Sequence, residues 1–149
     1  AHVHLKQAAV ELRISSAGSV DIARNDLGLA RALLLEGHFE AARKLSIEVH
    51  AAVLERAPVI AADAKTVEGQ AAAGQGLLDE AARAYRGAVM ILTGIGSDRG
   101  AAQLWFELAG LLEGVGELDA ARDAYRSAGA STGLRERASA VALDGTHLV

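Results

Sequence analysis

The sequence contains no cysteine, which excludes a disulfide framework, a thiolate metal site and a cysteine nucleophile. It also lacks any run of about 18 apolar residues, so no segment is expected to span a membrane. The N-terminus has neither the basic start nor the apolar middle of a signal peptide. We therefore expect a cytoplasmic protein. Because no initiator methionine is present, we also expect the chain to be a fragment or a processed form.

A chain of 149 residues suits one domain or one compact array of repeats, and it can bury about 70% of the surface that its unfolded form exposes. The 15 basic and 19 acidic residues give a net charge of −4, which argues against a surface that grips duplex nucleic acid. We therefore expect a single domain over residues 1–149 that makes no direct nucleic-acid contact.

The most informative feature of the sequence is an internal repeat. Three segments read alike, each with a glycine followed by an acidic residue, two alanines and an arginine. Their spacings along the chain are 39 and 40 residues. The matched positions are Gly37, Gly76 and Gly116, and Ala42, Ala81 and Ala121.

Each repeat is predicted to be a pair of helices joined by a short turn. In the third repeat, apolar residues recur at helical spacing from Ala101 to Leu112, and a second stripe runs from Leu118 to Ala128. Gly116 lies in the gap between them, where glycine can adopt a positive φ without a Cβ clash. The repeats are predicted over residues 20–57, 59–96 and 98–130.

Two further helices are predicted to flank the repeats, over residues 2–14 and 132–143. Ser19 and Ser97 are predicted N-caps, because a serine hydroxyl accepts a hydrogen bond from an otherwise unpaired amide. Pro58 is predicted to end the helix before it, since the residue preceding a proline avoids the α region. The predicted fold class is therefore all-α, a helical-hairpin solenoid of about three repeats with flanking helices and no convincing strand.

The repeats resemble those of the tetratricopeptide repeat family in their small and aromatic positions. The third repeat carries the resemblance in Trp105, Leu108, Ala109, Leu112, Gly116, Leu118, Ala121, Tyr125 and Ala128. The second supplies Gly69, Ala72, Gly76, Leu78, Ala81, Tyr85 and Ala88, and the first Leu29, Ala30, Leu33, Gly37, Phe39 and Ala42. The resemblance covers about residues 20–130. It is typical of helices that approach closely at small residues, with aromatic residues filling the gaps.

The repeats depart from the family pattern in several places. The usual repeat has about 34 residues, and the longer period resembles versions found in bacterial regulators. Ser46 replaces the expected aromatic residue of the first repeat, and Glu68 stands where the second should carry leucine. A HEAT-like or other helical-pair solenoid therefore remains an alternative.

No constellation of catalytic or metal-ligating residues is visible in the sequence. The histidines lack the spacing of a zinc site; they are His2, His4, His38, His50 and His147. The glycine-rich segment 94–100 precedes a helix, but no strand comes before it and no Lys-Ser/Thr pair follows. We therefore predict no catalytic residue, no metal and no cofactor, and a function that is not enzymatic.

Solenoids bind partners on the concave surface that their first helices line. Phe106 is one position round the helix from Trp105 and is expected to face this groove, and the turn-by-turn count places equivalent residues in each repeat. The predicted groove consists of Arg24, Leu27, Arg31, Leu34, Asp63, Thr66, Gln70, Gln103, Phe106, Gly110 and Glu113. Its two basic residues and lack of asparagine argue against the carboxylate clamp of chaperone-docking family members.

The expected function is protein–protein interaction, with a peptide or helix bound in the groove and Phe106 and Arg31 as its main anchors. The resemblance also implies an alternative, the ligand-sensing or oligomerisation part of a larger bacterial transcription regulator. Terminal repeats expose faces that neighbours cover elsewhere, so a homodimer is compatible with the same architecture.

Overall fold

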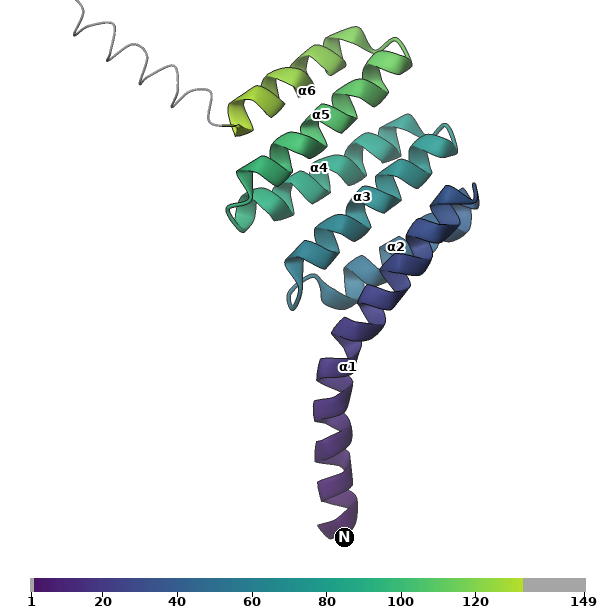
Figure 1. Ribbon diagram of the computed structural model, residues 1–149, viewed down its shortest axis with the longest axis vertical. Coiled ribbons are helices and arrows are strands. Elements are labelled where there is room, and N and C mark those ends of the chain that lie inside the picture. Colours follow the sequence, from purple (N-terminus) through teal and green to yellow (C-terminus); the bar gives the residue numbers. More distant parts are fainter. Residues whose placement is uncertain (1, 133–149) are drawn as a thin grey trace, which may run out of the picture.

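The computed structural model describes the backbone of residues 2–132 and the side chains of residues 18–132 (Figure 1). Within this range the chain forms six helices and no strand. The helices are α1 (His2–Leu35), α2 (Phe39–Val53), α3 (Pro58–Gly74), α4 (Leu78–Gly94), α5 (Asp98–Gly114) and α6 (Leu118–Ser131). The prediction of an all-helical chain is confirmed for this part of the sequence.

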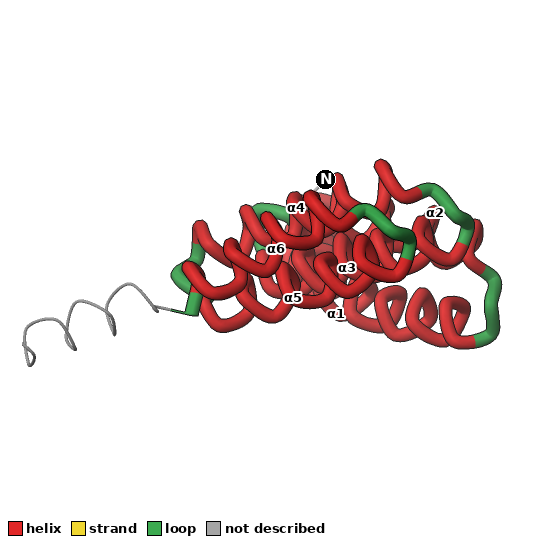
Figure 2. The backbone as a smooth tube through the Cα atoms, turned by 90° about the horizontal axis from the view of Figure 1, so that it is seen from above, coloured by secondary structure: helices red, strands yellow, loops and turns green. Residues whose placement is uncertain are grey.

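Each helix packs against the next, and α1 also contacts α3. The six helices form three antiparallel pairs that lie side by side, which we number hairpin 1 (α1 and α2), hairpin 2 (α3 and α4) and hairpin 3 (α5 and α6) (Figure 1). Viewed from above, the odd-numbered helices form one layer and the even-numbered helices form the other (Figure 2). The first helices of the three hairpins therefore share one face of the molecule.

Glycines in the left-handed region close the turns within the hairpins. Gly37, Gly76 and Gly116 have φ of 82°, 77° and 85°. After Gly76, the amide of Leu77 donates a hydrogen bond to the carbonyl of Ala72 at 2.9 Å, and the other two turns repeat this bond. This arrangement satisfies helix carbonyls that would otherwise lack a donor. The predicted turn positions are thus confirmed, and the main chain closes them.

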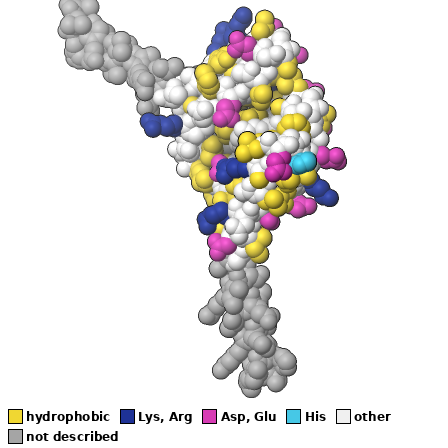
Figure 3. All heavy atoms as spheres, turned by 45° about the vertical axis from the view of Figure 1, so that its right-hand side comes forward, with side chains coloured by type: hydrophobic (Ala, Val, Ile, Leu, Met, Phe, Trp, Pro, Cys, Tyr) yellow, Lys and Arg dark blue, Asp and Glu magenta, His cyan; other side chains and the backbone are white. Residues whose placement is uncertain are grey.

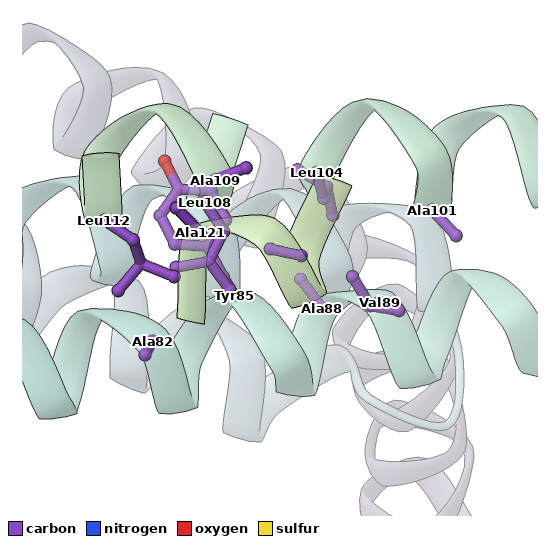
Figure 4. Packing of buried hydrophobic residues seen from close by; sticks show 11 residues of the cluster. Ala82, Tyr85, Ala88, Val89, Ala101, Leu104, Leu108, Ala109, Leu112 and Ala121 are labelled. Carbon is purple, nitrogen blue, oxygen red and sulfur yellow. The ribbon is translucent and has the colours of Figure 1, made fainter. Parts of the chain in front are cut away.

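The core is made mainly of small side chains, since 18 of the 27 buried hydrophobic residues are alanines. One cluster joins hairpins 1 and 2 through residues such as Leu27, Val53 and Val67. The other joins α4, α5 and α6, and in it Tyr85 lies among Leu108, Ala109 and Leu112 (Figure 4). Alanine adds little apolar area per residue, so these helices gain stability chiefly by approaching closely.

The predicted break between a flanking helix and the first repeat is wrong. Helix α1 runs without interruption from His2 to Leu35, and its N-terminal half extends beyond the other helices (Figure 1). Gly18 lies in the predicted break, but a single glycine inside a helix costs only about 1 kcal/mol relative to alanine. No proline occurs there to stop the helix. The predicted helix over 132–143 lies outside the described residues.

Neither predicted serine cap forms its capping hydrogen bond. Ser19 lies inside α1, where its hydroxyl accepts a hydrogen bond from Arg56 at 2.8 Å and so ties α1 to the turn after α2. Ser97 does occupy the N-cap position of α5, but its side chain makes no capping bond. The backbone carbonyl of Ser97 accepts the first helical bond instead, from the amide of Ala101 at 3.0 Å.

Candidate functional site

The layer formed by α1, α3 and α5 carries the predicted groove residues. We call the exposed and half-buried side chains of this layer the α1–α3–α5 face; it comprises Arg24, Arg31, Asp63, Gln103, Phe106 and Glu113. Charged and hydrophobic side chains are interspersed on the surface of the molecule, as one view of it shows (Figure 3). The face itself has two arginines, two acidic residues, a glutamine and a phenylalanine, so it is mixed in character and not uniformly of one charge.

An ion pair connects the first two helices of this face. Nη2 of Arg31 lies 3.5 Å from Oδ2 of Asp63, and both side chains are about half exposed. Partial burial raises the pKa of the Asp63 carboxyl above its usual value, and the nearby Arg31 guanidinium opposes that rise. Arg24 is directed elsewhere, toward Asp21 on its own helix at 3.3 Å. Two predicted groove residues from different repeats, Arg31 and Asp63, are thus brought together.

The apolar anchors predicted on α1 are not available at the surface. Leu27 is only 3% exposed and belongs to the core between hairpins 1 and 2, so its assignment to the groove is wrong. Leu34 is half-buried against the same cluster. The physical reason is that α1 packs against α3 as well as α2, which covers the side of α1 where these leucines lie.

The predicted groove residues of α3 are half-buried and have partners within the fold. The hydroxyl of Thr66 donates a hydrogen bond to the carbonyl of Ala62 at 3.0 Å. The side chain of Gln70 is a hydrogen-bond partner of the Tyr85 hydroxyl, which also lies 3.5 Å from Glu107. Burial, and then the Glu107 carboxylate, raise the pKa of Tyr85. These two residues of α3 therefore serve the packing of hairpin 2.

The predicted residues of α5 gather around Tyr125 of α6. Phe106 meets the Tyr125 ring edge-on, with 5.5 Å between ring centroids and an angle of 70°. The Tyr125 hydroxyl donates a 2.7 Å hydrogen bond to Glu113, which raises the pKa of Tyr125. A hollow of about 390 Å³ opens beside them between α5 and α6, lined in part by Gln103 and Thr132.

Tyr125 was expected only as a core aromatic residue of the repeat, and its role in this cluster was missed. The sequence carried one signal, because Tyr125 belongs to the third repeat and the pattern of glycine, acidic residue, two alanines and arginine does not recur after it. Its pairing with Phe106 depends on how α6 folds back on α5, which the spacing of 19 positions does not encode.

One ion pair joins the even-numbered helices of hairpins 1 and 2, and a second lies within α3. Arg43 of α2 pairs with Glu80 of α4, and Lys65 pairs with Glu68 at 3.1 Å within α3. His50 lies near this second pair. Partial burial, and then the charge of Lys65, lower the pKa of His50, while Glu68 acts in the opposite direction. Glu80 lies in the first turn of α4, where a negative charge complements the helix dipole, and its pairing with Arg43 also holds two hairpins together.

The side chains of the described residues form a surface of mixed polar and apolar character. No group of three or more His, Cys, Asp or Glu side chains among them is placed to hold a metal ion. None of the helices within residues 2–132 combines the length and the apolar character needed to cross a membrane. No protein-family model, curated protein or solved structure matches the chain. The α1–α3–α5 face presents two guanidinium groups, two carboxylates, a carboxamide and an aromatic ring.

Proposed function

We propose that the chain is a non-enzymatic, tetratricopeptide-like solenoid module that binds a segment of another protein along the α1–α3–α5 face. The observation that carries this proposal is Phe106, which is 58% exposed, more than any other aromatic side chain among the described residues. The exposed Gln103 lies on the same helix, and the exposed Arg31 lies two helices away in the same layer.

Two general properties of interfaces support Phe106 and Arg31 as anchors. Aromatic and arginine side chains are enriched among the few residues that contribute most of the binding energy. The ion pair of Arg31 with Asp63 is exposed to water, where such a pair contributes about 0–1 kcal/mol, so a carboxylate of a partner can compete for the guanidinium at little cost. The partner that suits the face is an extended peptide or amphipathic helix with one acidic and one apolar anchor.

The repeated architecture supports the same proposal. Hairpins with matched glycine turns and small residues at matched positions place their first helices in one layer, and such layers form continuous binding surfaces in repeat proteins. A long surface of this kind recognises a chain in extended or helical form more readily than a small molecule.

The proposal is tested with a random peptide library displayed on phage and selected against the immobilised chain. Selected peptides are then synthesised and titrated by calorimetry against the wild type and against Arg31→Ala, Gln103→Ala and Phe106→Ala. Arg86→Ala and Met90→Ala serve as matched controls, because both side chains are exposed on α4 in the opposite layer.

We expect Phe106→Ala or Arg31→Ala to weaken binding at least about tenfold, while both control variants bind as the wild type does. Peptides that bind equally well to all three α1–α3–α5 variants would overturn the proposal. So would peptides whose affinity falls only in the two α4 variants.

A further inference from the structure

The N-terminal end of the row of hairpins exposes apolar side chains at positions that are buried inside the row. We call Ile22 and Leu29 of α1 the N-terminal end face. Ile22 is 62% exposed, whereas the equivalent residues Ala61 and Ala101 are 0% and 1% exposed. Leu29 is 53% exposed, whereas its equivalents are the half-buried Glu68 and Leu108, which is 0% exposed. Hairpin 1 thus presents the surface by which hairpins 2 and 3 pack against the hairpin before them.

The C-terminal end shows the reciprocal feature. We call the apolar lining of the hollow between α5 and α6 the C-terminal end face; it consists of Ala102, Tyr125, Ala128, Gly129 and Phe106, the last of which also belongs to the α1–α3–α5 face. Tyr125 is 37% exposed, whereas the residues at its equivalent positions, Tyr85 and Ser46, are 2% and 0% exposed. Those two positions are covered by a following hairpin within the described residues, and position 125 is not.

The two end faces match each other because the chain already contains the interface that they would form. Inside the row, Ala88 and Val89 of α4 pack with Ala101, Leu104 and Leu108 of α5 (Figure 4). The equivalents of the α4 residues are Ala128 and Gly129 on the C-terminal end face. The equivalents of the α5 residues are Ile22, Asn25 and Leu29 at the N-terminal end.

From this correspondence we propose that the chain associates head to tail, with the C-terminal end face of one copy packed on the N-terminal end face of a second copy. The contact continues an interface that the fold uses twice already, between hairpins 1 and 2 and between hairpins 2 and 3. Gly129 and Asn25 replace Val89 and Leu104, so less apolar surface is buried than inside the row. The association is therefore weaker than the internal packing, and it is reversible.

A second copy fits better than the rest of this chain because it supplies both faces at once. A head-to-tail contact joins two different faces, so each added copy leaves one face free at either end. Such contacts form a closed ring only when the rotation between successive copies brings the two ends together, and otherwise they form an open chain. The expected species are consequently dimers at low concentration and longer assemblies as the concentration rises.

The experiment measures mass by sedimentation velocity and light scattering over a concentration series of the full chain. Leu29→Arg blocks the N-terminal end face and Tyr125→Arg blocks the C-terminal end face; both side chains are partly exposed, and circular dichroism checks the fold of each variant. Met90→Arg is the matched control, because it charges an exposed apolar side chain that belongs to neither end. Arg31→Ala, which disables the proposed peptide-binding face, is measured in parallel.

We expect the wild type, Met90→Arg and Arg31→Ala to associate alike, and each end variant to weaken association at least about tenfold. An equimolar mixture of the two end variants is expected to form dimers and nothing larger, because it contains one intact pair of faces. A wild type that stays monomeric up to about 1 mM overturns the proposal. So does association that survives either end variant, or a mixture that stays monomeric. Loss of peptide binding in Arg31→Ala is read separately and bears only on the proposed function.

Discussion

The ring of Tyr85 on α4 lies directly against the backbone of Gly69 on α3. A Cβ atom at position 69 would come within 2.8 Å of the Tyr85 Cδ2 atom and within 3.3 Å of the carbonyl oxygen of Ala81. Because Tyr85 is buried on all sides, its ring has no room to withdraw. The absence of a side chain at position 69 therefore sets how closely the two helices of hairpin 2 approach.

Gly69→Ala is expected to lower the free energy of unfolding by about 1–3 kcal/mol, because the added methyl group overpacks this contact. Gly28→Ala is the control, since a Cβ atom at this exposed position of α1 meets nothing within 4 Å. That change is expected to raise the free energy of unfolding by about 0.5–1 kcal/mol. Urea denaturation measures both, and stabilisation by both substitutions would contradict the predicted clash.

Gly116→Ala is expected to destabilise the protein by about 1–2 kcal/mol, although a Cβ atom there would meet nothing within 4 Å. The cause is its φ of 85°, which alanine rarely adopts. Gly110→Ala, at an exposed position inside α5 without a positive φ, is expected to stabilise. If thermal melting shows the same shift for both variants, backbone conformation does not decide the effect.

The lowered pKa of His50 predicts that the folded protein loses stability in mild acid. Its pKa in the folded chain lies below the ordinary value of 6.5, so the unfolded chain takes up the proton more readily. The stability that neutral His50 contributes is therefore fully present above about pH 6.5 and falls as the pH drops toward the folded pKa. The unfolding free energy of His50→Gln is expected to vary less with pH in this window.

The neighbours of His50 give this prediction two controls of opposite sign. Lys65→Met removes a positive charge and is expected to raise the pKa of His50, whereas Glu68→Gln removes a negative charge and is expected to lower it further. Titration of the His50 ring by NMR measures both shifts. Shifts in the same direction would contradict the electrostatic account.

The contribution of Asp63 to stability changes with pH in the opposite direction to that of His50. Its folded pKa lies above the ordinary value of 3.8, so its contribution to stability is greatest below about pH 3.8 and is lost as the pH rises through the folded pKa. The wild type is expected to lose stability as the pH rises through this window, whereas Asp63→Asn does not. The unfolding free energy of the variant minus that of the wild type is therefore expected to increase with pH. Arg31→Met, which removes the charge that opposes the shift, is expected to raise the pKa of Asp63 further. An unchanged carboxyl titration in Arg31→Met would show that the two side chains are not coupled.

The helix pairs and their turns could be predicted from the sequence because residues close together in the chain determine them. The spacing of apolar residues and the glycines Gly37, Gly76 and Gly116 are properties of single segments, and each segment folds as its pattern indicates. The same reasoning placed a helix boundary before Ser19, where serines and Gly18 weaken helical propensity. Weak propensity does not end a helix that has no proline and no left-handed turn residue, so α1 continues.

The site residues were harder to predict because their exposure depends on neighbouring elements. Leu27 and Phe106 occupy equivalent positions in their repeats, yet α3 covers Leu27 while no described hairpin covers Phe106. The pairing of Arg31 with Asp63 likewise depends on how α1 and α3 approach each other. Helical periodicity assigns a residue to a face of its own helix and does not indicate what lies opposite that face.

The alanine-rich core determines how the protein responds to substitutions that enlarge a buried side chain. An alanine side chain has no rotamers to adjust, so an added methylene at a position such as Ala72 or Ala109 can be accommodated only by displacement of a whole helix. In a row of hairpins, such displacements add up along its length. Substitutions deep in this core are thus expected to change the spacing of neighbouring hairpins and, with it, the relative positions of the exposed side chains on the α1–α3–α5 face.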